Sequence, residues 1–380
     1  MSETMLAVRK MKSEKGLEVR EVPRPVAGPE DVLVYVEAAS ICGTDLHIWN
    51  WDDWSQRRIK PPLTLGHEFC GTIVAVGDKV RHAAVGDYVS AESHVTCGMC
   101  YQCRTGQAHM CPTTQILGVD RDGAFAHYVS VPEKVIWQNN RAKLPPEIAT
   151  LQEPFGNAVY STMNQDLSGQ SVAVLGCGPI GLFTIGIAKA VGAKAVFASD
   201  IHPFRIDLAR KMGATDVFNP SAPRRAGADT VAEIVEANGG YGVDVVLEMS
   251  GAPTAITTAF RVVRNGGTVI LFGIPSKPVE IDVAENMIFK NLTVLALNGR
   301  RIFDTWYKTR WLLEDGVVDL RPLITKTITF NEVNDAMAML QRGDACKLVL
   351  LPNGGKPPDI PGPRRVRTPD PNISGAPVHR

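Results

Sequence analysis

The stretch SVAVLGCGPIG, residues 171–181, indicates a strand, a tight turn and the start of a helix. Its first five residues are small or apolar, which is typical of a buried strand. The next six fit G-x-G-x-x-G, in which the first glycine makes the turn, the second lets a pyrophosphate approach the backbone, and the third packs the helix against the strand. The N-terminus of that helix offers N–H groups to phosphates. The stretch therefore predicts a dinucleotide site at Gly176, Gly178 and Gly181.

An acidic residue follows at the distance that this motif requires. Residues 195–199 are predicted to form the next strand, and Asp200 ends it about 20 residues beyond the glycines. A carboxylate there accepts hydrogen bonds from the cofactor ribose and repels a 2′-phosphate, which favours NAD over NADP. Arg205 is an argument for NADP, because an arginine near the ribose tolerates a phosphate. The alternative is a glycine turn and a capping aspartate without a ligand.

Strands and helices alternate after the glycine-rich turn, as in the βαβ units of a parallel sheet. The predicted helices are 179–191, 203–212 and 253–264, and the predicted strands are 243–248, 268–272 and 292–297. Two further helices, 305–313 and 331–340, and a last strand, 347–351, close the ordered part. The pattern predicts an α/β fold with a doubly wound parallel sheet.

The N-terminal and C-terminal regions follow other patterns. Residues 1–150 are rich in glycine and proline, and their short apolar runs, such as 32–36 and 71–77, predict a β-rich, barrel-like domain. Residues 353–380 are rich in proline, include Arg364, Arg365 and Arg367, and are predicted to be disordered. A chain of 380 residues is long enough for two domains.

The composition excludes some classes of partner. Lys and Arg total 40, as do Asp and Glu, so the chain is predicted to bind neither nucleic acid nor a membrane surface. No apolar stretch approaches the roughly 18 residues of a membrane span, and the N-terminus lacks the pattern of a secretory signal. Four of the eight cysteines are scattered, which is typical of a cytoplasmic protein with reduced thiols.

The other four cysteines, Cys97, Cys100, Cys103 and Cys111, have the spacing C-x2-C-x2-C-x7-C. Zinc prefers tetrahedral ligation by sulfur or nitrogen, and four thiolates leave no open position for chemistry. We therefore predict a structural zinc site here. The alternative is a zinc-ribbon module that binds nucleic acid or acts as a scaffold, but the residues around the loop are mixed rather than basic and aromatic.

A second candidate metal site combines Cys42, in SICGTDLH (40–47), with His67 and Glu68, in LGHE (65–68). Glu153, in QEPFGN (152–157), is a further candidate. Two or three protein ligands with a water or substrate oxygen describe an open, catalytic zinc site. Taken alone, such a cysteine is more often a small buried residue and such a histidine a packed one, so spacing leaves both interpretations open.

These motifs occur together in a known superfamily. C-G-T-D-x-H, G-H-E, the four-cysteine loop and G-x-G-x-x-G, in this order, resemble the zinc-dependent medium-chain alcohol dehydrogenases over residues 5–351. Within that superfamily the chain is most similar to the L-threonine 3-dehydrogenases. The similarity lies in the segments ICGTDLHIWNWDDW (41–54), EPFGNAV (153–159), EMSGA (248–252), GIP (273–275) and FDTWY (303–307).

The resemblance implies a set of catalytic roles. The catalytic zinc is expected at Cys42, His67 and Glu68, and Glu153 is expected beside it as a ligand, a holder of water or a group that orients the substrate ammonium. Thr44 and His47 match a hydroxyl–imidazole proton relay. The implied activity is zinc-assisted oxidation of the L-threonine β-hydroxyl, with hydride transfer to NAD and 2-amino-3-oxobutanoate as product.

The resemblance also implies a domain plan and further cofactor contacts. Residues 1–157 and 299–352 are expected to form a GroES-like catalytic domain with both zinc sites, and residues 158–298 an NAD-binding Rossmann domain. The enzyme is expected to be a homotetramer. His94 is placed near the substrate, where it either tunes specificity or has no role. The additional cofactor residues are Ile180, Arg205, Phe272, Gly273, Ile274, Leu297 and Asn298, of which Asn298 departs from the tyrosine often found there.

One alternative enzyme uses the same groups. A polyol dehydrogenase or another secondary-alcohol dehydrogenase of this superfamily would share the zinc ligands and the NAD site. Rates on threonine, sorbitol and butanediol separate these activities, and two zinc ions per chain would support both metal sites.

Overall fold

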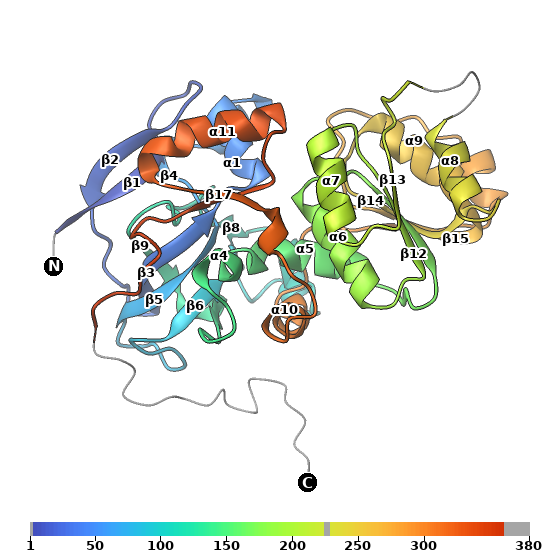
Figure 1. The fold of residues 1–380 in the computed structure, drawn as a ribbon. Coiled ribbons are helices and arrows are strands. Elements are labelled where there is room, and N and C mark those ends of the chain that lie inside the picture. Colours follow the sequence, from blue (N-terminus) through green and yellow to red (C-terminus); the bar gives the residue numbers. More distant parts are fainter. Residues whose placement is uncertain (1–2, 224–228, 361–380) are drawn as a thin grey trace, which may run out of the picture. The chain divides into compact units, whose positions relative to one another are not determined.

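The computed structural model describes residues 3–223 and 229–360. The chain divides into two compact units (Figure 1). The first contains the residues up to Pro154, Arg301–Asp315 and the residues from Ile324 onward, and the second contains Phe155–Arg300 and Gly316–Leu323. The first unit is therefore assembled from segments far apart in the sequence.

The first unit is built on mostly antiparallel sheets. Its largest sheet has the order β10-β6-β5-β3-β18-β17, with β9 also paired to β3, and smaller sheets contain β2-β1-β4 and β7-β8. The strands are β1 (Thr4–Lys10), β2 (Glu18–Pro23), β3 (Asp31–Ser40), β4 (Leu63–Thr64), β5 (Glu68–Val76), β6 (Tyr88–Ala91), β7 (His94–Val95), β8 (Gln115–Ile116), β9 (Tyr128–Pro132), β10 (Ile136–Gln138), β17 (Ile324–Ile328) and β18 (Lys347–Leu350).

Strand β3 lies at the centre of this unit, and nearly all of its residues are buried. Such burial on both faces explains why it is a continuous apolar run rather than an alternating one. Helix α11 packs Val333, Ala336 and Met337 into the same core, at the i, i+3, i+4 spacing of an amphipathic helix. The helices of this unit are α1 (Gly43–Asn50), α2 (Asp53–Arg58), α3 (Tyr101–Arg104), α4 (Pro146–Ala149), α10 (Asp304–Glu314) and α11 (Val333–Arg342), and α5 (Gln152–Thr162) continues into the second unit.

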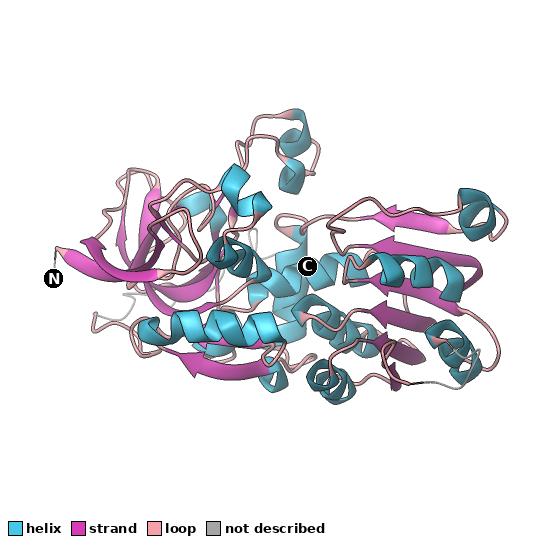
Figure 2. Ribbon diagram, turned by 90° about the horizontal axis from the view of Figure 1, so that it is seen from above, coloured by secondary structure: helices cyan, strands magenta, loops and turns pink. Residues whose placement is uncertain are grey.

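The second unit contains a parallel sheet with the strand order β13-β12-β11-β14-β15-β16. Figure 2 shows these strands side by side, flanked by helices. The strand order reverses between β11 and β14, and in such sheets ligands bind outside the carboxyl ends of the strands at that point. The elements are β11 (Ser171–Leu175), α6 (Pro179–Ala190), β12 (Ala195–Ser199), α7 (Pro203–Lys211), β13 (Asp216–Phe218), α8 (Thr230–Ala237), β14 (Val243–Glu248), α9 (Pro253–Val262), β15 (Val263–Leu271) and β16 (Thr293–Ala296).

The predicted α/β class is confirmed, and most predicted elements agree with the structure to within a few residues. The sequence does not predict β13 and α8. Strand β13 has three residues, none of them fully buried, so its pattern is weak. Strand β15 begins at Val263, before the predicted start at residue 268, because α9 leads directly into it and Gly266 takes a positive φ of 70°.

Two boundaries differ from those expected. The sequence places residues 316–323 in the first domain, but they group with the second unit, where a Cβ on Gly186 of α6 would lie 3.1 Å from Val318. The disordered tail was predicted to begin at residue 353, but Asn353 is held in place. Its Nδ2 donates to the carbonyls of Val36 (2.9 Å) and His127 (3.0 Å). The remainder of that segment, 361–380, lies outside the described residues.

Candidate active site and nucleotide site

Cys42, His67 and Glu68, here called the open cluster, lie together in the first unit. Cys42 is the N-cap of α1, His67 ends the loop before β5, and Glu68 begins β5. One ligand atom from each lies within 4.8 Å of the other two, and His67 and Glu68 are buried. A thiolate, an imidazole and a carboxylate are the donor types that zinc binds. The structure therefore brings together the three residues predicted for the catalytic metal.

Asp45 supports two of these residues from within α1. Its Oδ2 accepts the backbone N–H of Cys42 at 2.9 Å, and its Oδ1 lies 3.8 Å from Nδ1 of His67. Burial raises the pKa of Asp45 to about 6, although the charge of His67 and the Cys42 N–H lower it. Burial also lowers the pKa of His67, but the charges of Cys42, Asp45 and Glu153 outweigh that effect and raise it well above its ordinary value. With Nδ1 facing Asp45, Nε2 is the ring nitrogen left for a metal.

Glu68 has a buried cationic partner that the sequence analysis missed. Its Oε2 accepts from Lys347 Nζ at 2.5 Å and from the Ser40 hydroxyl, whereas its Oε1 is buried and finds no hydrogen-bond partner among the described residues. Lys347 is 2% exposed and also donates to the carbonyl of Ile41 at 2.9 Å. An unsatisfied carboxylate oxygen beside a thiol and an imidazole fits a metal ligand. The open cluster thus fits zinc by its donor set and by this oxygen.

Of the residues predicted to be catalytic, Thr44 lies near Cys42, Glu153 is buried and His47 is exposed. Thr44 Oγ1 is 3.8 Å from Cys42 Sγ. Glu153, near the start of α5, is buried, and its Oε1 accepts the Ser93 hydroxyl at 2.6 Å. His47 is 61% exposed, and its Nδ1 lies 2.5 Å from Oδ2 of Asp52. In the described part of the chain His47 and Thr44 share no hydrogen bond, so the structure does not join the two members of the predicted relay directly.

A third group of potential ligands, here called the Glu92 cluster, comprises Glu92, His94 and Glu153. One ligand atom from each lies within 4.8 Å of the other two. Glu92 is fully buried, and it accepts from the ring of His94 at 2.9 Å and from the indole N–H of Trp306 at 2.8 Å. The sequence analysis did not select Glu92 or Trp306. The only signal for Trp306 was the segment FDTWY (303–307), whose partner the sequence does not reveal.

The four clustered cysteines lie between β7 and β8, with one sulfur from each within 4.8 Å of the others. The sulfurs of Cys97 and Cys111 are 3.6 Å apart. The backbone N–H groups of Met99 and Cys100 point at Cys97 Sγ, 3.4 Å away, and these hydrogen bonds lower the pKa of Cys97 to about 6. Thiolate-stabilising N–H groups and four converging sulfurs fit a closed structural zinc site.

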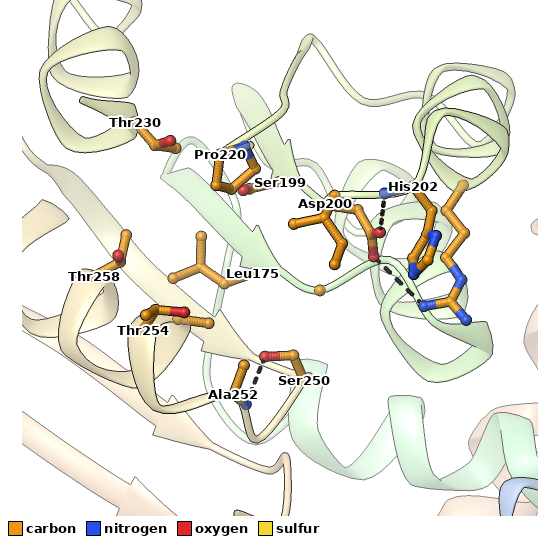
Figure 3. A pocket seen from close by; sticks show the side chains of 14 residues that line it. Leu175, Ser199, Asp200, His202, Pro220, Thr230, Ser250, Ala252, Thr254 and Thr258 are labelled. Atoms are coloured by element: carbon orange, nitrogen blue, oxygen red, sulfur yellow. Dashed lines mark hydrogen bonds and ion pairs between the residues drawn. The ribbon is translucent and has the colours of Figure 1, made fainter. Parts of the chain in front are cut away.

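A cavity of about 210 Å³ opens at the carboxyl ends of β11 and β12 in the second unit (Figure 3). Gly176 lines it with a φ of +97°, and a Cβ there would lie 2.6 Å from the Ser250 Cβ. Asp200 is held by two backbone N–H groups, since its Oδ2 accepts from Cys177 and its Oδ1 from His202, both at 2.8 Å. Arg205 Nη1 lies 3.9 Å from the same carboxylate. The end of the strand, the first glycine of the turn and the acid of the dinucleotide motif therefore meet at one cavity.

Glu248, at the end of β14, fixes a neighbouring loop of this cavity. Its carboxylate accepts from the N–H and hydroxyl of Ser250 (2.9 and 2.5 Å) and from the N–H of Gly251 (3.0 Å), and burial raises its pKa. A Cβ on Gly273 would lie 2.0 Å from the Gly251 nitrogen, so the loops after β14 and β15 interlock only with glycine there. Of the predicted cofactor residues, the cavity is lined by Gly176, Asp200 and Arg205, and the others lie outside it: Gly178, Ile180, Gly181, Phe272, Gly273, Ile274, Leu297 and Asn298.

Comparison with known proteins places the chain in a family. Two family models match it, the alcohol dehydrogenase GroES-like domain over residues 28–141 and the zinc-binding dehydrogenase over residues 179–314. An L-threonine 3-dehydrogenase from Symbiobacterium thermophilum is 47% identical, over 93% of this chain and 99% of its own. This chain belongs to the L-threonine 3-dehydrogenase family.

Solved structures agree with this family. A zinc-binding dehydrogenase from Sinorhizobium meliloti 1021, bound to NADP, has a TM-score of 0.84 and 32% identity, covering 92% of this chain and 100% of that one. A 2R,3R-butanediol dehydrogenase from Bacillus subtilis has a TM-score of 0.82 and 30% identity, with the same coverage. The predicted family, the GroES-like and Rossmann fold, and the class of zinc-dependent dehydrogenase are confirmed.

Proposed function

We propose that this enzyme oxidises the β-hydroxyl of L-threonine to 2-amino-3-oxobutanoate, with NAD as hydride acceptor. The observation that carries the proposal is Glu153, a buried carboxylate that lies close enough to the open cluster to influence His67. A plain alcohol brings no positive charge to such a carboxylate, whereas an amino alcohol offers it an ammonium group. The names of the relatives that match over nearly the whole chain support the same substrate.

The metal ligands and their chemistry are part of this proposal. Cys42, His67 and Glu68 hold a catalytic zinc, and Cys97, Cys100, Cys103 and Cys111 hold a structural one. Zinc, when bound in the open cluster, supplies a Lewis acid that favours the ionised form of the substrate hydroxyl. Glu153 orients the substrate through its ammonium group, and the Ser93 hydroxyl holds this carboxylate in place at 2.6 Å.

The proton of the substrate hydroxyl leaves through residues of the first unit. Thr44, next to Cys42, accepts the proton and passes it toward His47, which is exposed and reaches solvent. Asp52 orients the His47 ring through Nδ1. Although burial raises the pKa of Asp52, hydrogen bonds from Ser55 and His47 outweigh burial and lower it, so this residue stays ionised. Because Thr44 and His47 share no direct hydrogen bond, the transfer requires a bridging hydroxyl of substrate, cofactor or water.

The geometry of Asp200 supports NAD over NADP. Both carboxylate oxygens are already oriented by backbone N–H groups, and the side chain is nearly buried at the cavity wall. A 2′-phosphate would be placed against this carboxylate, and Arg205, 3.9 Å from it, is engaged with its charge. NAD, when bound, accepts the hydride. A preference for NADP in rate measurements would contradict this role of Asp200.

The cellular form of the enzyme is also proposed. We infer a cytoplasmic homotetramer that binds neither nucleic acid nor membranes. The balanced charge of 40 basic and 40 acidic residues and the scattered positions of Cys42, Cys70, Cys177 and Cys346 in the sequence support this inference. No helix in the described part of the chain is long and apolar enough to cross a membrane. A sizing measurement tests the tetramer.

The deciding experiment is a rate panel with a metal count. Purified enzyme is assayed for NADH formation with L-threonine, 2,3-butanediol and sorbitol, and zinc is measured per chain. Threonine should give the highest kcat/KM, with two zinc ions per chain. A higher kcat/KM for butanediol would favour the second candidate, a secondary-alcohol dehydrogenase, which the likeness to the butanediol enzyme supports.

A further inference from the structure

Lys347 is a buried lysine with two hydrogen-bond acceptors beside the open cluster. Its side chain is 2% exposed. Its Nζ donates to the carbonyl of Ile41 at 2.9 Å and to Oε2 of Glu68 at 2.5 Å. Ile41 directly precedes Cys42, and Glu68 is the first residue of β5. One ammonium group therefore joins the two segments that bring Cys42 and Glu68 to the open cluster.

Strand pairing fixes the place of Lys347. It begins β18, all four residues of which are buried. In that strand Val349 lies opposite Ser40 at the end of β3, and Ser40 in turn lies opposite Glu68 in β5. A lysine is an expensive residue for a buried strand, because its desolvation offsets the attraction to its partner, and an apolar side chain would often stabilise as well. The lysine therefore calls for a role beyond the stability of the sheet.

The two oxygens of the Glu68 carboxylate have different surroundings. Oε2 accepts from Lys347 and from the Ser40 hydroxyl, whereas Oε1 is buried and finds no hydrogen-bond partner among the described residues. The backbone carbonyl of Glu68 accepts from the Thr150 hydroxyl at 2.9 Å, so the main chain of this residue is also held by a side chain. A carboxylate binds a metal through one oxygen or through two. With Oε2 engaged, Oε1 is the oxygen that remains for a metal.

We propose that Lys347 is a positioning residue for the catalytic metal, which makes Glu68 a ligand through a single oxygen. A carboxylate that gives one oxygen leaves room for the substrate oxygen that an open zinc site requires. The Ile41 carbonyl anchors the lysine, and the lysine acts on the metal through Glu68 rather than on the reacting atoms. This inference rests on the metal ligands of the proposed function.

The test measures zinc binding by the full-length protein with Lys347→Met, which removes the charge and the N–H donors but keeps a long side chain. Dialysis against buffers of fixed free zinc, with a metal count per chain, gives the concentration that half-fills each site. For the open cluster this concentration should rise about 10-fold, as is typical when a group that orients a metal ligand is lost. Cys42→Ser, which removes a ligand, gives the curve of the four-cysteine loop alone. Lys347→Gln should show a smaller rise, and it decides the test if Lys347→Met does not fold.

Glu37→Gln is the matched control for general destabilisation. Glu37 is as buried as Glu68 and lies in β3, where it accepts from Thr72 (2.6 Å) and Arg141 (2.6 Å). Disrupting this second buried pair should lower the free energy of unfolding. The free zinc that half-fills the open cluster should nevertheless change by less than about 2-fold. An equal loss of zinc affinity in Glu37→Gln and Lys347→Met would reduce Lys347 to a purely structural residue and overturn the inference.

A double variant shows whether Lys347 acts through Glu68. With Glu68→Gln the charged carboxylate is already gone, so adding Lys347→Met should weaken zinc binding no further. Additive losses, or an unchanged zinc affinity in Lys347→Met alone, would overturn the inference. An unmodified enzyme that binds one zinc ion per chain, or that fails to oxidise threonine, would instead overturn the proposed function, so the two failures are distinguishable.

Discussion

Buried carboxylates define the chemistry of the first unit, and each has a different partner. Glu68 faces Lys347, Glu153 faces Ser93, Glu92 faces Trp306 and His94, and Asp45 faces Cys42 and His67. A lysine offers its carboxylate a positive charge, whereas a hydroxyl offers only a hydrogen bond. Lys347 therefore brings a buried cation to Glu68, while Ser93 orients the carboxylate of Glu153 by a hydrogen bond alone.

Glu153→Gln tests the ammonium contact at the scale of one residue. Glutamine preserves size and can still accept the Ser93 hydroxyl, but it carries no charge. We expect kcat/KM for L-threonine to fall about 30-fold, as for loss of a charged hydrogen bond of about 2 kcal/mol, with little change for 2,3-butanediol. Equal losses on the two substrates would contradict an amino-group role. Zinc content is measured in parallel to exclude loss of the metal.

His47→Ala tests the path of the proton. Without the imidazole, the proton must leave to water or hydroxide, and hydroxide becomes scarcer as pH falls. Turnover should therefore decrease by about 10-fold at about pH 6 and by much less at alkaline pH, with zinc retained. Asp52→Asn, which removes the partner of the ring, should give a smaller loss with the same pH trend. A variant as active as the unmodified enzyme at every pH would exclude the relay.

Loops at the carboxyl ends of the parallel strands line the cavity at which we propose that the nucleotide binds. The sequence was sufficient to predict the strand, turn and helix at residues 171–190, because those features follow from local spacing. The family resemblance, carried by the order of the motifs, also predicted that Cys42, His67 and Glu68 lie together. Lys347 was missed because its partner, Glu68, is 279 residues away, and Glu92 and Trp306 were missed because they lie 214 residues from each other. Tertiary contact, not local pattern, selects them.

Asp244 joins two elements of the second unit and gives a stability prediction. It accepts from the N–H and hydroxyl of Ser171 in β11, both at 2.7 Å, and from Arg264 in β15 at 2.6 Å. Burial alone would raise its pKa, but these hydrogen bonds outweigh burial and lower it to about 2. A folded-state pKa below the unfolded value stabilises the protein above about pH 4, and that contribution is lost as pH falls toward about 2.

Asp244→Asn should therefore destabilise the second unit by about 1 kcal/mol at neutral pH, a value reduced for solvent screening of a partly exposed group. The difference between variant and unmodified protein should shrink on acidification from about pH 4 toward about pH 2. Chemical denaturation at several pH values measures it. Asp207→Asn, which removes an exposed ion pair with Arg210 on α7, serves as control and should change stability little. A pH-independent difference would contradict the assignment.

At the scale of the whole molecule, the cysteine loop is separate from the open cluster in sequence and in ligand type. Cys103→Ser should reduce the zinc content from two ions to one per chain and lower Tm by about 5 °C or more, since metal binding contributes directly to folding. The rate per folded, zinc-loaded active site should be nearly unchanged. Met99→Ala, in the same loop and largely exposed, should alter neither quantity. A stable Cys103→Ser protein without activity would contradict a purely structural role.

Strand β18 has a consequence for biosynthesis. It pairs with β3, carries Lys347 to Glu68, and lies beyond the entire second unit in the sequence. A ribosome delivers the N-terminal end of a polypeptide first, so Cys42, His67 and Glu68 emerge long before their counter-charge. Co-translational folding of the first unit therefore cannot finish until the second has been made. A product truncated before residue 347 would keep the parallel sheet of the second unit. It would lack the strand that pairs with the end of β3, and Glu68 would lack Lys347.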